Sequence, residues 1–283
     1  MKVHIVVPEH RSSWILARLA RYLVDKNKWS AGPKPTKGAD LNIFIPYLEW
    51  RFTKWMATKT AGWMTHYEPD DNCRRKAWDL AARKLTLRVT PCRQYAKLLS
   101  VSGLTAHIPH PVELKKFVLK GHPRNLRSTV GVSGVVYPGG RKGEKLVKRL
   151  HEGHGKQWSI KAAGRGWPVK CRWYPWGRLQ EFYHGLDVFL CTSLIEGGPV
   201  TMLEALACGR PIVVPHGVGA VDDLPIGPGI YRYKAGDYDA MVFAIEMALL
   251  ERPEPEVMRR YVKPYPVKAW AKHWRVAAEK LCG

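Results

Sequence analysis

Two glutamates, Glu196 and Glu204, stand eight residues apart in a segment suited to binding an activated, charged substrate. An apolar run that ends at Cys191 predicts a buried strand, and a glycine turn comes soon after it. A helix is then expected from near Pro199, since proline favours the first turn of a helix. The free N–H groups at a helix N-terminus suit a phosphate. Glu196 would lie near the reacting end of the ligand, and Glu204 a few ångströms deeper.

Each glutamate also has an ordinary structural explanation, because Glu196 could be a capping carboxylate and Glu204 a solvated helix residue. The surrounding segment, Ser193–Val214, favours the functional explanation. Its run of Glu, Gly, Pro, a second Glu, Ala, Ala-Cys-Gly, Pro and Val resembles the E-x7-E signature of glycosyltransferase family 4. This resemblance implies the GT-B fold and a retaining transfer of a sugar from a nucleoside-diphosphate (NDP) sugar.

Four further segments look like parts of the same family. Ile108–Phe117 is similar to its "IPNGVD…F" segment, and Gly134–Gly143 to its "GR…KG" segment. Ala163–Gly166 is similar to its "GxG" strand end, and Leu186–Leu190 to the apolar strand before the signature. The resemblance covers nearly all of residues 105–250 and, more loosely, the first lobe.

The chain departs from the family's pattern at two places. Val135 stands where the family has an arginine, so we expect Arg141 to make that phosphate contact beside Lys142. Arg11, Ser12 and Ser13 replace the family's glycine pair after the first strand, which would put Ser12 in the donor-facing loop.

The resemblance implies a role for each candidate residue. Glu196 would act beside the sugar as the catalytic carboxylate, and Glu204 would hold the ribose hydroxyls. The leaving diphosphate needs cations and N–H donors, which would come from Lys142, Arg141, Gly197, Gly198, Pro199 and Val200. Because Arg141 and Lys142 can neutralise a diphosphate unaided, we expect no metal and no cofactor beyond the NDP-sugar.

Other polar and aromatic residues each allow a functional and a structural interpretation. His66 resembles a strand-end histidine of the family, which would hydrogen-bond a sugar hydroxyl or assist near the acceptor oxygen; a structural histidine fits the position equally well. Asp70 and Asp71 are alternative acids at that edge, although a solvated turn explains them better. Trp173 and Tyr174 could stack on the donor base or be core aromatics.

The chain carries 46 Lys and Arg residues against 24 Asp and Glu residues, a formal net charge of +22. Such an excess says little about fold but argues for a polyanionic partner, either nucleic acid or an anionic membrane surface. No acidic residue occurs from Leu80 to Val112.

The first hypothesis for the acceptor is a hydroxylated base in DNA, flipped into the active-site cleft. The first lobe would contact phosphates through Arg51, Lys54, Arg74, Arg75 and Lys76. Trp50, Trp55 and Trp63 would supply stacking surfaces. A short basic lobe of this kind would suit a compact viral DNA-modifying enzyme.

The second hypothesis is a lipid acceptor, with the basic helix over residues 72–85 lying on an anionic membrane. The third is a non-catalytic sugar-nucleotide or DNA-binding protein on a transferase scaffold. We favour nucleic acid, because the charge is spread through the chain and no strongly hydrophobic face accompanies it.

The elements that must position these residues alternate between strands and helices, which predicts α/β domains with mostly parallel sheets. Residues 1–122 are expected to form an N-terminal acceptor-side Rossmann-like lobe, and residues 123–262 a C-terminal nucleotide-sugar-binding one. The two lobes would face each other across a cleft. Residues 263–283 carry Trp270 and Trp274 one helical turn apart and predict a helix that packs back on the first lobe.

The six cysteines show no CxxC or other ligand spacing and stand mostly in apolar contexts. They predict buried thiols in a reducing compartment rather than disulfides or a zinc site. The run Met1–Val7 has no signal-peptide architecture, and no apolar run approaches the roughly 20 residues of a membrane span. We therefore expect a cytoplasmic protein without a transmembrane segment, in the host cytoplasm if viral.

Overall fold

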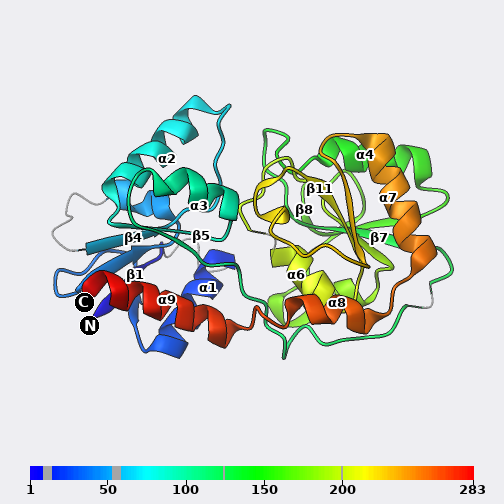
Figure 1. Cartoon of the computed structure of the whole chain (residues 1–283). Helices are drawn as coiled ribbons and strands as arrows, with labels where there is room; N and C mark the ends of the chain where they lie inside the picture. Colours follow the sequence, from blue (N-terminus) through cyan, green and yellow to red (C-terminus); the bar gives the residue numbers. More distant parts are fainter. Residues whose placement is uncertain (9–14, 53–58, 124, 199) are drawn as a thin grey trace. The chain divides into compact units, whose positions relative to one another are not determined.

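The chain folds into two compact units, seen in a computed structural model that describes residues 1–8, 15–52, 59–123, 125–198 and 200–283. Unit 1 comprises Met1–His110 and Val267–Gly283, and unit 2 comprises Pro111–Pro266. Each unit is a parallel sheet with helices packed on it (Figure 1). Both are therefore Rossmann-like α/β domains, as the alternation of strands and helices predicts.

The described part of unit 1 contains a parallel sheet in the order β2-β1-β3-β4-β5-β6. Its strands are β1 (Val3–Val6), β2 (Ser30–Gly32), β3 (Leu41–Phe44), β4 (Lys59–Trp63), β5 (Leu87–Thr90) and β6 (Thr105–His107). Every residue of β1, β3 and β5 is buried. Burial on both faces is the reason these strands are mostly apolar rather than alternating.

Helices cover both faces of this sheet. Its helices are α1 (Ile15–Asn27), η2 (Tyr47–Phe52), α2 (Asn72–Lys84), α3 (Arg93–Ser100) and α9 (Val267–Cys282). Side chains of α1 and α9 join one core cluster, and side chains of η2, α2 and α3 join the other. Asp71 caps α2, because its carboxylate accepts a hydrogen bond from the backbone N–H of Arg74 at 3.0 Å.

Three tryptophans fix α9 on unit 1. The ring of Trp63, at the end of β4, lies 5.3 Å from the ring of Trp270 and 5.3 Å from that of Trp274. The side chain of Asn27 in α1 donates to the carbonyl of Ala271 at 3.0 Å. Trp63 is fully buried, so the expectation that it stacks on nucleic-acid bases is wrong. It ends β4, a strand inside the sheet whose last four residues are all buried.

The described part of unit 2 contains a second parallel sheet, in the order β12-β11-β10-β7-β8-β9. Its strands are β7 (Thr129–Val135), β8 (Ser159–Arg165), β9 (Cys171–Arg172), β10 (Val188–Leu190), β11 (Ile212–His216) and β12 (Ile230–Lys234). The chain adds β8 and β9 on one side of β7, then returns to add β10, β11 and β12 on the other. The order reverses between β7 and β10, and the crevice at such a switch point is where open α/β sheets bind ligands.

The helices of unit 2 also form two layers. They are α4 (Glu144–His154), η3 (Trp176–Arg178), α5 (Leu179–His184), α6 (Val200–Ala207), η4 (Gly219–Val221), α7 (Tyr238–Glu251) and α8 (Pro255–Val262). Side chains of α5, α6 and α8 join one core cluster, and those of α4 and α7 join the other.

The boundary between the units lies at His110 and Pro111 rather than at 122 and 123. Val112 and Phe117 belong to the core of unit 2. Two arginines bind the carbonyl groups of this stretch: Arg259 donates to Leu114 at 2.7 Å and to Phe117, and Arg210 donates to Lys120 and Gly121 at 2.7 Å each. The stretch is thus held on unit 2, which a loop rich in Gly, Pro and basic residues did not indicate.

The tryptophan cluster predicts that unit 1 depends on α9 for stability. Trp274→Ala should cost about 3–5 kcal/mol, since it empties a fully buried site. Native-state hydrogen–deuterium exchange should then accelerate in β1, β3 and β4 and stay unchanged in β7 and β10. The control Val276→Ala, half exposed on the same helix, should cost less than about 0.5 kcal/mol. Equal acceleration in both units would contradict this assignment of α9.

Candidate active site at the switch point of unit 2

Two loops meet at the switch point, one after β7 and one after β10. Because these parallel strands are paired, both loops leave the same edge of the sheet. The backbone N–H of Leu194 donates to the carbonyl of Arg141 at 2.8 Å, and the hydroxyl of Thr192 donates to the carbonyl of Lys142 at 2.7 Å. Gly143 has φ of +65°, and a Cβ there would collide with the carbonyl oxygen of Thr192. Hydrogen bonds to backbone carbonyls and this close approach hold the two loops together.

Glu196 and Lys142 form an ion pair between these loops. The Lys142 Nζ lies 2.8 Å from Oε2 of Glu196. The same oxygen accepts a hydrogen bond from the hydroxyl of Ser193 at 3.3 Å, and Oε1 accepts from the N–H of Gly198 at 3.4 Å. Glu196 is only 7% exposed. A nearly buried carboxylate is therefore held by a cation and by local donors, as a buried charge requires.

The protonation of Lys142 follows from this pair. Burial lowers the pKa of its ammonium, but the Coulomb attraction and hydrogen bond of Glu196 outweigh burial and leave the pKa above its ordinary value. A cation whose folded-state pKa is raised stabilises the fold fully below its ordinary value, about 10.4. That contribution is lost as pH rises through the folded-state value. Lys142 is thus a fixed cation across the physiological range.

Glu204 lies deeper, inside α6, and is 2% exposed. Its Oε2 accepts a hydrogen bond from the phenol of Tyr183 at 2.7 Å. Tyr183 comes from α5 and is fully buried. Burial, then the charge of Glu204, raises the pKa of Tyr183 well above its ordinary value, so the phenol stays a proton donor to the carboxylate.

The turn between Glu196 and α6 contains the other donor-site candidates of this loop. Gly197 is buried, Gly198 is partly exposed, and Val200 is the first residue of α6. The carbonyl of Glu196 accepts a hydrogen bond from the N–H of Ala220 at 3.1 Å, which ties this turn to the loop after β11. Pro199 lies outside the described residues, as do Ser12 and Lys54 of the first lobe.

The remaining predicted residues belong to unit 1. His66 follows β4, is partly exposed, and its Nδ1 lies 3.0 Å from the hydroxyl of Thr65. Arg51 and Lys76 are exposed. Arg74 pairs with Glu68 at 2.7 Å and with Asp71 at 3.3 Å; these bonds partly neutralise the charge predicted to grip a polyanion. Arg75 donates to the side chain of Asn72 at 3.1 Å.

The sequence did not indicate two residues of the unit 2 site. Ser193 lies within the signature-like segment but was given no role, although a hydroxyl three residues before Glu196 at a strand end is within reach of that carboxylate. Tyr183 is 21 residues from Glu204 in the chain. No spacing rule connects two positions on different helices, so only the fold could reveal this contact.

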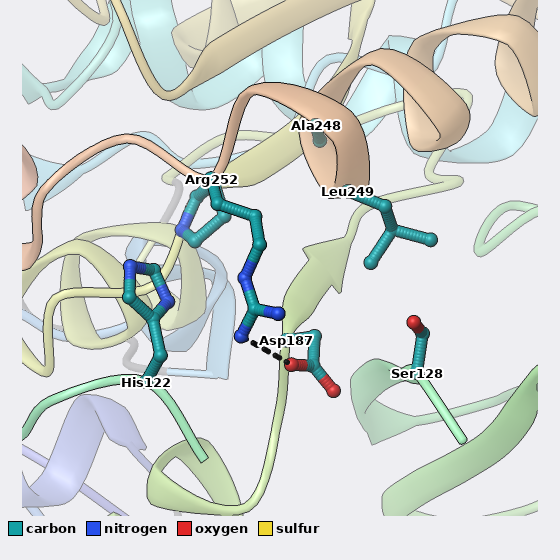
Figure 2. A pocket seen from close by; sticks show the side chains of 7 residues that line it. His122, Ser128, Asp187, Ala248, Leu249 and Arg252 are labelled. Atoms are coloured by element: carbon teal, nitrogen blue, oxygen red, sulfur yellow. Dashed lines mark ion pairs between the residues drawn. The ribbon is translucent and has the colours of Figure 1, made fainter. Parts of the chain in front are cut away.

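A small cavity lies at the opposite, amino edge of the unit 2 sheet (Figure 2). It has a volume of about 20 Å³ and is lined by residues that precede strands, among them Ser128 and Asp187. Asp187 pairs with Arg252 at 3.7 Å and accepts hydrogen bonds from the backbone of Thr129 and the side chain of Asn125, both at 2.8 Å. The volume suits about one water molecule, so this cavity cannot hold a sugar nucleotide.

Two carboxylates at the start of α7 have structural partners. Asp237 and Asp239 are spaced like an Asp-x-Asp metal pair, yet Asp237 caps α7 and Asp239 lies 4.0 Å from Arg149. Among the described residues, no group of three or more His, Cys, Asp and Glu side chains is arranged to hold a metal ion. None of the described helices is long and apolar enough to cross a membrane.

Comparison with protein families finds a match within unit 2. A family model described as "Glycosyl transferases group 1" matches residues 153–264, which include Glu196 and Glu204. The lipopolysaccharide 1,6-galactosyltransferase of Escherichia coli K12 is 29% identical over 159 residues. That match covers 47% of this chain and 43% of the relative, so it spans less than half of either protein.

Solved structures match along the whole chain. The apo form of the lipopolysaccharide outer core galactosyltransferase WaaB has a TM-score of 0.74 at 14% identity, with 99% of both chains covered. Anabaena Alr3699/HepE in complex with UDP has a TM-score of 0.75 at 11% identity, with 99% of this chain and 100% of that chain covered. At such identities the likeness shows the fold, which is GT-B.

The ion pair predicts a specific response to the loss of its cation. Lys142→Met should destabilise unit 2 by about 3 kcal/mol at pH 8, because it leaves a nearly buried carboxylate without its counter-charge. The deficit should shrink as pH falls, since the pKa of Glu196 rises in this variant and protonation removes the uncompensated charge. Urea unfolding at pH 5 and pH 8 measures both effects.

The matched control for this experiment is Lys145→Met, an exposed lysine on the neighbouring helix α4. It should change the stability by less than about 0.5 kcal/mol at either pH. Equal effects of the two substitutions, or a deficit that grows toward low pH, would show that Lys142 does not compensate Glu196.

Proposed function

We propose that this protein is a glycosyltransferase that takes its sugar from an NDP-sugar bound at the switch point of unit 2. The observation that carries the proposal is the Lys142–Glu196 pair, placed where open α/β sheets bind ligands. Support comes from the glycosyl transferases group 1 match over residues 153–264 and from the UDP held by a structure of the same fold.

The proposed reaction exchanges one bond at the anomeric carbon for another. The acceptor oxygen bonds to that carbon while the bond to the diphosphate breaks and leaves its electron pair on the phosphate oxygen. The proton of the acceptor hydroxyl must pass to a base, and the diphosphate oxygen that gains negative charge is itself such a base. Charge therefore develops at two places: positive on the sugar ring and negative on the diphosphate.

The pair offers a group for each of these charges. Lys142, with Arg141 beside it, supplies positive charge for the diphosphate, and the N-terminal end of α6 adds backbone donors. Glu196 supplies negative charge for the oxocarbenium-like ring. Because both charges are fixed by the folded loops before substrate arrives, they need little reorganisation during reaction.

Glu204 is proposed to bind the ribose, and the family 4 resemblance further implies retention of configuration at the anomeric carbon. The Tyr183 hydrogen bond occupies one side of Oε2, and Oε1 has further acceptor capacity for hydroxyl protons. Retention would be read from the anomeric coupling constant of the product by NMR.

For the acceptor we propose an anionic, lipid-linked saccharide. Two of the similar proteins are named as galactosyltransferases of lipopolysaccharide, and the charge of +22 suits an anionic carrier. Of these arguments, only the charge would also suit a hydroxylated DNA base as acceptor. Trp63 is buried and cannot stack on bases, Arg74 is paired with Glu68, and the comparisons do not support a DNA acceptor. The non-catalytic alternative predicts NDP-sugar binding without turnover, which the assay below distinguishes.

Glu196→Gln should lower kcat by about 10²- to 10³-fold, since it removes a charge aimed at the transition state. Glu204→Gln should instead raise KM for the donor by about tenfold with kcat little changed. Release of nucleoside diphosphate from a panel of NDP-sugars, with added acceptor, measures both constants. Glu152→Gln, an exposed glutamate on α4, serves as the control. Wild-type turnover by folded Glu196→Gln protein would reject the assignment.

The proposed site should also work without a divalent metal. Lys142 and Arg141 supply positive charge at the proposed diphosphate position, and because Lys142 shares its charge with Glu196, the backbone N–H groups at the start of α6 supply the rest of the stabilisation. The same assay in EDTA should therefore keep at least half of the activity. Complete loss on chelation, restored by Mg²⁺ or Mn²⁺, would show that these side chains do not suffice.

A further inference from the structure

Unit 1 exposes aliphatic side chains beside basic ones. Leu98 in α3 is 45% exposed, Val101 in the following turn is 88% exposed, and Leu104 before β6 is 42% exposed. Single exposed aliphatic residues are ordinary on protein surfaces. These three fall within seven residues of chain, where helical spacing places Leu98 and Val101 on one face.

A buried arginine brings the end of α2 to the same place. The Arg88 guanidinium, 3% exposed, donates to the carbonyls of Ala82 at 3.0 Å and Leu85 at 2.5 Å, and also to the carbonyl of Leu104 at 3.2 Å. One side chain thus links the last turn of α2 to the turn after α3. Gly103, at φ of +126°, lies against the same guanidinium, which fixes the turn.

The exposed charges at this place are positive, and the nearest acidic residue along α2, Asp79, lies one helical turn before Arg83. Arg83 and Lys84 end α2, and Lys97 lies one helical turn before Val101; all three are exposed. None of the three forms an ion pair with another described residue, and no acidic residue occurs from Leu80 to Val112. The set Arg83, Lys84, Lys97, Leu98, Val101 and Leu104 is called the basic–apolar surface below. The α2 and α3 helices that carry it are neighbours in Figure 1, joined by Tyr67, which contacts Trp78 and Tyr95.

The combination of residue types selects the partner. A nucleic-acid backbone attracts the three cations but gives exposed Leu and Val side chains nothing to bind. An anionic bilayer surface takes both, because its head groups attract Lys and Arg while aliphatic side chains insert at the boundary with the acyl chains. The expectation that no hydrophobic face accompanies the charge does not hold at this place.

We propose that unit 1 docks on the surface of an anionic lipid bilayer through the basic–apolar surface. The inference extends the proposed function and rests on it for the lipid-linked acceptor, whereas docking itself requires neither donor nor transfer. It also narrows the membrane contact, expected over the whole of residues 72–85, to the Arg83 and Lys84 end of α2, because Arg74 at the other end pairs with Glu68 and Asp71.

Binding to vesicles tests the proposal on the full chain without any sugar nucleotide. Sedimentation with phosphatidylglycerol–phosphatidylcholine vesicles should show binding, and phosphatidylcholine vesicles alone should bind far less. The triple variant Arg83→Ser, Lys84→Ser, Lys97→Ser should lower the partition coefficient about a hundredfold, at about fivefold for each basic residue near an anionic leaflet. The double variant Leu98→Ser, Val101→Ser should lower it at least tenfold. All these positions are exposed, so thermal unfolding should stay unchanged.

Two matched controls distinguish docking through the basic–apolar surface from nonspecific attraction of the whole protein to the vesicles. Ile226→Ser changes an aliphatic side chain of unit 2 that is 90% exposed. Lys145→Ser, Lys148→Ser, Arg149→Ser removes the same charge from α4 of unit 2. Both control proteins should bind vesicles within about threefold of the wild type, since they leave the basic–apolar surface intact.

Three outcomes would overturn the proposal. The wild-type protein could fail to bind anionic vesicles, or the α4 triple variant could lose as much binding as the unit 1 triple variant. The Leu98→Ser, Val101→Ser variant could also bind vesicles as the wild type does, which would show that binding depends on charge alone. Tight binding of duplex DNA at the same salt, lost in the unit 1 triple variant alone, would then identify nucleic acid as the partner. The donor assay in vesicle-free buffer reports separately on the proposed function.

Discussion

The ion pair between Lys142 and Glu196 joins loops that stand 54 residues apart in the chain. It needs paired β7 and β10 to bring the loops to one edge, and it needs Gly143 to let their backbones touch. A carboxylate buried this deeply requires its cation, so sheet topology, loop conformation and site charge depend on one another. Replacing either partner alters both the stability of unit 2 and the electrostatics that a donor would meet.

Much of unit 2 was predictable, because β10 and β11 are mostly apolar, and β7 and β8 carry Val, Ile and Ala between turn residues. The signature-like segment pointed directly to Glu196. The long-range partners were not predictable: Tyr183 meets Glu204 only because α5 and α6 pack together, and Arg210 holds residues 120–121 from 89 positions away. The expectation for Trp63 was wrong for a different reason, since basic neighbours in sequence do not show that β4 is an inner strand with both faces buried.

Charge shows the same limit. The net charge counts every cation of the chain, but only the fold distinguishes exposed cations from those that are already paired. Arg74 binds two carboxylates, and Arg88 is buried against backbone carbonyls, whereas Arg83, Lys84 and Lys97 remain exposed. An arginine used inside the fold contributes to the formal charge of the chain without contributing to its outer surface.

Helix α9 gives unit 1 a discontinuous chain: its sheet is made first, unit 2 follows, and the tryptophan-bearing helix is made last. During synthesis on the ribosome, the apolar face around Trp63 therefore has no cover until all of unit 2 has emerged. Unit 2 is a continuous stretch and can fold while that face is still open. Exposed apolar surface on nascent chains invites aggregation, so the order of synthesis gives chaperones a defined interval in which to bind this protein.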